Sequence, residues 1–172
     1  MTEHDPITEL DTRFSSPGAV ATPWDEAREQ LERAEIWWLS TVRPDERPHV
    51  TPLIAVWVEG ALYFGTGPAE RKVKNLQTNT RCVLTTGCNA MGEGLDLVVE
   101  GDAVRVTDEP AIRRVAEAFA SKYDEPFVFT AGDGVLLGEG GEVVVFEVRP
   151  TTAFGFARGE TFSHTRWRFQ EN

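Results

Sequence analysis

Two strand-like runs joined by only two residues, Glu59-Gly60, constrain the fold of this chain more than any other feature. Residues 49–58 and 61–66 are rich in β-branched and aromatic side chains, and a connection this short permits only an antiparallel hairpin. Pro48 and Pro52 cannot donate a ladder hydrogen bond, so the start of the first run should lie at a sheet edge or face a ligand. The hairpin therefore predicts antiparallel pairing with one open edge.

The rest of the chain repeats this pattern of strands in sequence with short turns. Further strands are predicted over 36–42, 81–86, 95–106, 142–148, 152–156 and 162–169, with a bulge or bend at Gly101. Helices are predicted over 22–34 and 69–76 and from Asp108 onward, and 130–141 is expected to be a loop. This order favours a mainly β fold, an antiparallel β-barrel with flanking helices, over a parallel βαβ sheet.

The N-terminal segment differs in composition from the rest. Residues 1–21 are rich in Asp, Glu, Thr, Ser and Pro and are predicted to be a disordered lead-in, followed by a single domain over residues 22–172. The segment lacks a basic start and an apolar stretch, and no apolar run reaches the roughly 18 residues of a membrane span. We therefore expect a cytoplasmic protein that does not insert into membranes.

The charge balance narrows the partners further. With 17 Lys and Arg against 28 Asp and Glu, the net charge is −11, which argues against binding nucleic acid or anionic membranes. Cys82 and Cys88 have neither CxxC spacing nor a histidine nearby, so they are expected to be reduced thiols. The three histidines show no metal-ligand spacing, and no metal site is predicted.

A basic cluster in this acidic chain follows the glycine-rich turn 65–68. It consists of Arg71, Lys72 and Lys74. At 100° per residue, Arg71, Lys72 and Asn75 share one helical face. A phosphate at the start of this helix would meet free amides, the helix dipole, two cations and the Thr66 hydroxyl. The alternative interpretation is a solvated basic face without a ligand.

Two other segments could complete a cofactor site. Along the strand His49, Val50, Thr51, Pro52 and Leu53, backbone groups could read the polar edge of a flat ring; otherwise this is an ordinary edge strand.

Near the C-terminus, Trp167 and Arg168 point to opposite sides of a strand, so Trp167 meets either a ligand or the core. His164 is a candidate for proton transfer. Because no nucleophilic triad, Walker motif or dinucleotide fingerprint is present, the chemistry of an enzyme here would come from a cofactor.

These pieces, in this order, resemble the pyridoxamine 5′-phosphate oxidase-like FMN-binding split β-barrel family, which includes flavin and deazaflavin oxidoreductases. The resemblance rests on Leu-Ser-Thr-Val at 39–42, Arg-Pro-His-Val-Thr-Pro at 47–52, Tyr-Phe-Gly-Thr at 63–66, Arg-Lys-Val-Lys-Asn-Leu at 71–76 and Thr-Arg-Trp-Arg-Phe at 165–169.

The resemblance implies a homodimer with two FMN-type sites at the subunit interface. It places the strand His49 to Leu53 against the ring and gives the phosphate to Thr66, Arg71 and Lys72, with Lys74 and Asn75 nearby. Trp167 and Arg168 would approach from the other subunit. Pyridoxamine phosphate oxidases carry an Arg-x-His pair near the C-terminus, whereas this chain has Phe162-Ser163-His164, so pyridoxamine phosphate is not the expected substrate.

The sequence therefore predicts an oxidoreductase that transfers hydride between FMN and a small molecule. A reductase that uses the deazaflavin coenzyme F-420 is the first alternative. A non-enzymatic flavin or haem binding protein is a further one, and haem would require an axial ligand such as His49 or His164.

Overall fold

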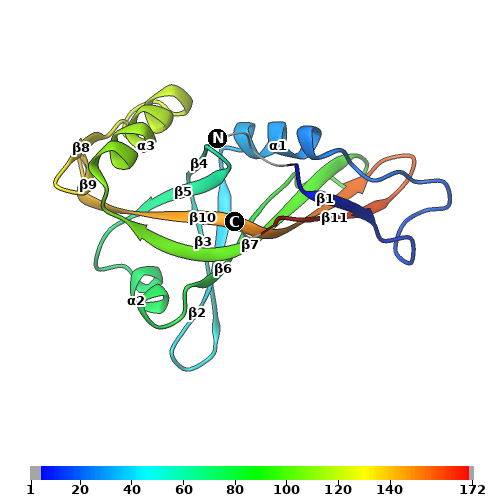
Figure 1. Cartoon of the computed structure of the whole chain (residues 1–172), viewed down its shortest axis with the longest axis horizontal. Helices are drawn as coiled ribbons and strands as arrows, with labels where there is room; N and C mark the ends of the chain where they lie inside the picture. The colour runs from blue at the N-terminus through cyan, green and yellow to red at the C-terminus, as the bar shows by residue number, and fades with distance from the viewer. Residues whose placement is uncertain (1–4, 171–172) are drawn as a thin grey trace.

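The computed structural model describes residues 5–170, which form an antiparallel β structure with three helices (Figure 1). The helices are α1 (Trp24–Arg33), α2 (Arg71–Thr78) and α3 (Glu109–Lys122). The strands are β1 (Ile7–Leu10), β2 (Trp37–Val42), β3 (Pro48–Leu53), β4 (Ala55–Val58), β5 (Ala61–Thr66), β6 (Arg81–Thr86), β7 (Gly94–Val106), β8 (Thr130–Gly132), β9 (Val135–Gly138), β10 (Gly141–Arg158) and β11 (Ser163–Arg168). The predicted mainly β, antiparallel split barrel is confirmed.

Strand β10 is shared between the two halves of the barrel. It is 18 residues long and pairs with β7 along most of its length, while its first half also pairs with β5 and its second half with β11. The main path runs β1-β11-β10-β7-β6-β2-β3, and β4 and β5 branch from β10. The sequence suggested two strands here, 142–148 and 152–156, where the structure has one.

The hairpin around Glu59-Gly60 is present, but the first predicted strand divides at Ile54. Residues on its C-terminal side form β4, which pairs with β5 through a turn whose central residues have φ of 49° and 81°. Positive φ at both positions is the type I′ geometry, whose twist matches that of the strands. Residues on the N-terminal side form β3, which pairs with β2 and ends the main path. The predicted open edge is confirmed.

The predicted irregularity at Gly101 is also confirmed. The register between β7 and β10 shifts between Pro150 and Thr152, directly across from Gly101. A Cβ at Gly101 would collide with the carbonyl oxygen of Arg149, so only glycine permits this close approach of the two backbones.

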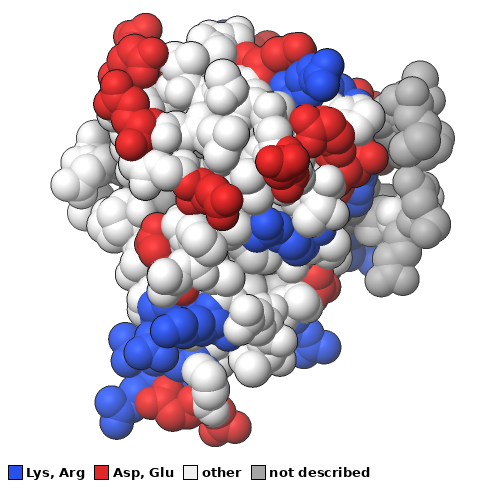
Figure 2. Space-filling view, turned by 90° about the vertical axis from the view of Figure 1, so that its left-hand side faces the viewer, with Lys and Arg blue, Asp and Glu red and all other residues white. Residues whose placement is uncertain are grey.

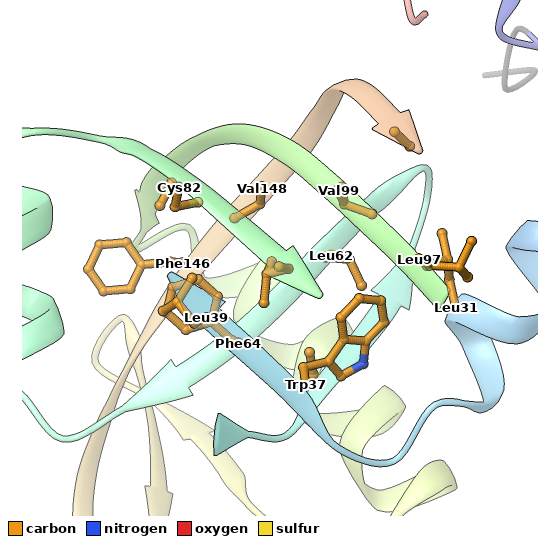
Figure 3. Close-up of a cluster of buried hydrophobic side chains, with 14 of the residues drawn as sticks. Leu31, Trp37, Leu39, Leu62, Phe64, Cys82, Leu97, Val99, Phe146 and Val148 are labelled. Atoms are coloured by element: carbon orange, nitrogen blue, oxygen red, sulfur yellow. The ribbon is translucent and has the colours of Figure 1, made fainter. Parts of the chain in front are cut away.

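The hydrophobic core divides into two clusters. The larger fills the barrel and includes Trp37, Leu39, Phe64 and Val99 (Figure 3). Helix α1, which the sequence predicted, buries Trp24, Ala27 and Leu31 from one of its faces against this cluster. The second cluster lies between α3 and strands β4, β5, β7, β9 and β10; from α3 it takes Ile112, Val115, Ala116 and Phe119.

The N-terminal segment is not a disordered lead-in over its described part. Residues 7–10 form β1 and pair with β11, and Glu9 accepts hydrogen bonds from Arg166 and Arg168. The composition of this segment predicted disorder, because composition alone does not show that β11 has an open edge with which four residues can pair. Residues 1–4, within the predicted lead-in, lie outside the described residues. Similarly, the loop expected over 130–141 contains the β8–β9 hairpin. Among the described residues, no helix is long and apolar enough to cross a membrane.

Candidate functional site: an anion-binding turn beside an open sheet edge

Helix α2 divides the predicted phosphate residues between its buried and exposed sides. It begins at Arg71, two residues later than expected, after a turn that includes Gly67 and Glu70. Lys72 is buried, with 6% of its surface exposed, and Asn75 is fully buried. Arg71 and Lys74 are exposed. Helical periodicity placed Arg71, Lys72 and Asn75 on one shared face; in the structure Lys72 and Asn75 are buried, while Arg71 lies at the rim.

The buried ammonium group of Lys72 faces two oxygen atoms. Its Nζ donates to Oγ1 of Thr66 at 3.2 Å and forms an ion pair with the carboxylate of Glu70. The other carboxylate oxygen of Glu70 accepts a hydrogen bond from the Gly67 amide at 3.1 Å. Lys72 and the Gly67 amide, two of the groups predicted to contact a phosphate, thus already hold the carboxylate of Glu70.

Glu70 is the member of this site that the sequence reasoning missed. Partial burial raises the pKa of its carboxyl group, but hydrogen bonds from Lys72, Thr66 and the Gly67 amide outweigh this effect, so the net pKa is lowered. An available signal was the spacing Gly67-x-x-Glu70, since an acid three residues after a turn residue can reach back to its amide.

A row of polar atoms without partners lies beside this turn. Asn75 donates from Nδ2 to Oγ1 of Thr41 at 2.9 Å, and Thr41 is the cross-strand partner of His49. Asn75 Oδ1, His49 Nδ1 and Thr51 Oγ1 are buried and have no hydrogen-bond partner among the described residues. Buried polar atoms left unpaired are costly, so the arrangement suits a ligand with a complementary polar edge.

His49 lies in a positive environment. Burial lowers its pKa, and the charges of Arg43, Lys72 and Arg71 lower it further. Arg43, on the turn after β2, was not selected from the sequence, because a lone arginine next to a proline-rich turn carries no motif. Its Nε is buried without a partner among the described residues. All three cations are therefore near enough to the imidazole for their charges to act on it.

Along β3, Val50 and Pro52 point outward, whereas Leu53 points toward the core. Val50 is half exposed, Pro52 is exposed, and Leu53 is partly buried against the core. Because β3 pairs only with β2 among the described strands, its other edge leaves backbone groups available. Figure 2 shows basic side chains gathering at the lower end of one face, the end that carries α2 in Figure 1, with acidic side chains over the upper part.

Trp167 does not belong to this site. It is fully buried, and its ring meets the edge of Trp24 at a centroid distance of 5.5 Å. The prediction that Trp167 approaches a cofactor is therefore wrong: the alternation of β11 has a core face, and the tryptophan is on it. Arg168 points to the other face, where it pairs with Glu9 at 2.6 Å.

His164 also lies away from the turn. It stacks on Phe14 and meets Phe156 edge to face, with centroid distances of 5.8 and 4.9 Å. It lines an open groove of about 730 Å³ together with charged residues that include Glu9 and Arg166. Four strands, β2, β6, β7 and β10, separate β3 from β11. Within one chain, the structure brings together His49, Thr51, Thr66, Lys72 and Asn75, but not His164 or Arg168.

The model of the pyridoxamine 5′-phosphate oxidase family matches residues 23–155, about three quarters of the chain. The protein belongs to this family. The match spans α1 to most of β10, so it includes α2, the turn before it and the edge strand β3. No curated protein matches the sequence.

Solved structures share the fold at low sequence identity. A candidate 5-nitroimidazole antibiotic resistance protein from Bacteroides thetaiotaomicron is 15% identical with a TM-score of 0.65, covering 99% of both chains. An FAD binding protein from Mycobacterium smegmatis is 20% identical with a TM-score of 0.53, covering 84% of this chain and 94% of the other. An F420 reductase is 22% identical with a TM-score of 0.51, covering 73% and 94%.

Proposed function

We propose that this member of the family is an oxidoreductase that binds FMN and transfers hydride to or from a small molecule. One observation carries the proposal: the Gly67 amide and Lys72, which is also bonded to Thr66, converge on a carboxylate, next to buried polar atoms that have no partner among residues 5–170. A phosphate ester attached to a flat, polar-edged ring has an anionic group for the donors of the turn and polar ring atoms for the unpaired side chains. The residues present therefore fit the cofactor.

The phosphate half of the cofactor would lie at the start of α2. Lys72 supplies a charge with little access to water, where charge-assisted hydrogen bonds are strong. The Gly67 amide adds a neutral donor, and the Thr66 hydroxyl, whose oxygen accepts from Lys72, still has its own hydrogen to donate. Arg71 and Lys74, which are exposed, would contribute from the rim.

The ring half would lie along β3. The polar side chains of His49, Thr51 and Asn75 could pair with ring nitrogen and oxygen atoms, and the free backbone edge from Val50 to Leu53 would hold the ring in plane. A bound flavin supplies the ability to accept or donate hydride. The protein would contribute by orienting the ring and the substrate and by excluding water from one side.

A homodimer would complete the site. The outer face of the sheet carries a row of cross-strand neighbours, and cross-strand neighbours point to the same side. The row is Pro52, Trp38, Thr85, Val98, Phe154 and Arg166. Trp38 is 49% exposed in the isolated chain, which favours a partner on this face. His164 and Arg168 lie two residues to either side of Arg166, so they share the face and could reach a partner's cofactor.

The deazaflavin coenzyme F-420 is the second candidate. Arg71 and Lys74 are exposed and would add positive charge beyond the buried Lys72, and such an extension suits a cofactor with a longer anionic tail. The likeness in fold to an F420 reductase is compatible with this candidate.

The proposal is tested by titrating the purified protein with FMN and with F-420. The wild type should bind one of them. Replacing Arg71 and Lys72 together with alanine should weaken binding by about 2–5 kcal/mol, because two charge-assisted contacts are lost. The matched control replaces Arg113 and Arg114 of α3, which changes the net charge equally and should leave affinity unchanged. Binding of neither cofactor would refute the proposal, and equal affinity of both double variants would refute the phosphate site. Sedimentation should give a dimer for the wild type and a monomer for Trp38→Glu.

A further inference from the structure

The carboxylate of Glu70 occupies the place where the proposed cofactor would put its phosphate. It accepts from the Gly67 amide and pairs with Lys72, and Lys72 in turn donates to Thr66. No other carboxylate forms an ion pair with Lys72 among residues 5–170. A phosphate and Glu70 therefore require the same donors and cannot use them together.

The two members of this ion pair differ in their freedom to move. The side chain of Lys72 is 7% exposed and is held beneath the turn, whereas that of Glu70 is 52% exposed. The turn does not depend on the carboxylate alone, because the Glu70 amide also donates to the Gly67 carbonyl at 3.1 Å. Glu70 can therefore rotate toward solvent while the lysine and the turn remain in place.

We propose that Glu70 is an internal competitor that sets the affinity of this site for phosphorylated ligands. This inference rests on the proposed function, since it assumes that the turn receives a phosphate. In the ligand-free protein Glu70 neutralises the buried Lys72. A phosphomonoester displaces it, because the phosphate offers three acceptor oxygens and close to two negative charges against one for the carboxylate.

Replacing Glu70 should strengthen ligand binding, whereas replacing an ordinary binding residue weakens it. Removing the charge of Glu70 leaves Lys72 buried without a counter-charge, so the ligand-free state is destabilised. A ligand that restores the negative charge then gains this free energy on binding. Since Glu70 is half exposed and water screens its charge, we expect about a tenfold gain in affinity rather than a larger one.

The experiment compares Glu70→Gln with Glu117→Gln. Gln keeps the size of the side chain and an acceptor for the Gly67 amide but removes the charge. Glu117, exposed on α3, provides a control with the same change in net charge. Affinity for FMN is measured by the loss of flavin fluorescence, and affinity for inorganic phosphate by the NMR shift of the Gly67 amide. Glu70→Gln should bind both about tenfold more tightly, and phosphate should raise its melting temperature more than that of the control.

The possible results distinguish the internal competitor from the FMN proposal. Tighter binding of phosphate by Glu70→Gln without any flavin binding would support the internal competitor while refuting the FMN proposal. Unchanged or weaker binding of both ligands, in a protein whose wild type binds FMN, would refute the competitor and leave the proposed function standing. A Glu70→Ala variant, which removes the acceptor as well, should also bind more tightly; weaker binding by both variants would identify Glu70 as a support for Lys72 instead.

Discussion

Substitutions at Gly155 and Trp167 should have non-additive effects on stability, because a side chain at position 155 would collide with the Trp167 ring. A Cβ added at Gly155 would lie 2.5 Å from Cη2 and 2.9 Å from Cζ3 of the Trp167 ring. Ordinary carbon contacts are about 3.5–4.0 Å, so the ring would have to move by about 1 Å. It has little room, because it is fully buried and Trp24 lies against it at 5.5 Å.

The expected cost of Gly155→Ala follows from two opposing terms. Overpacking a core typically costs about 1–3 kcal/mol. Replacing glycine in a strand recovers roughly 0.5–1 kcal/mol of chain entropy. We therefore expect a net loss of about 1–2 kcal/mol in the free energy of unfolding.

Gly155→Ala should hardly change the free energy of unfolding in a Trp167→Phe background. Phenylalanine lacks the outer part of the indole, which is the part that meets the added Cβ. Trp167→Phe alone should cost about 1–3 kcal/mol through the space it leaves. The double variant should then be more stable than the sum of the two single effects by about 1–2 kcal/mol.

Urea unfolding followed by far-ultraviolet circular dichroism measures these values without relying on tryptophan emission, provided that the m-value stays constant. Gly140→Ala is the control, because a Cβ at Gly140 meets nothing within 4 Å. Additivity within about 0.5 kcal/mol would refute the steric argument. Cofactor affinity should be unchanged in Trp167→Phe, and a large loss would refute the assignment of Trp167 to the core.

Two further predictions concern titratable groups. Because burial and the cations Arg43, Lys72 and Arg71 lower the pKa of His49, its NMR titration midpoint should lie below the usual value of about 6.5 and rise when phosphate binds; an unchanged midpoint would contradict the site. With its folded pKa below the unfolded one, the contribution of His49 to stability should be lost as pH falls from about 6.5 through the folded pKa. Burial, followed by the charge of Asp102, raises the pKa of Cys82 to about 12, whereas Cys88 is exposed, so at pH 8 a thiol reagent should label one cysteine in the native protein and both in denaturant.

Local rules in the sequence predicted the parts of the fold that depend on neighbouring residues. The two-residue connection at Glu59-Gly60 fixed a hairpin, and glycine at position 101 marked the irregularity between β7 and β10. The helical phase identified Lys72 and Asn75 as residues on a shared face, and both are buried at the start of the candidate site.

The predictions that were wrong concern places where segments distant in the sequence pack together. Alternation along β11 showed that Trp167 and Arg168 face opposite sides, but it could not show which side is the core. Composition predicted disorder before residue 22, although Ile7–Leu10 pairs with β11 at the other end of the chain. Glu70 was missed because its importance comes from Lys72 being buried beneath it, and burial depends on the whole barrel.

The sequence by itself determined an antiparallel β-barrel, an open edge at β3 and a basic helix after a glycine-rich turn, because hairpin length, proline chemistry and helical periodicity act over a few residues. Only the tertiary structure decided that Lys72 is buried against Glu70, that Trp167 is in the core and that His49, Thr51 and Asn75 hold polar atoms without partners in the described part of the chain. Those features depend on which surfaces exclude water when strands remote in the sequence pack together, and local sequence patterns do not show how remote strands pack.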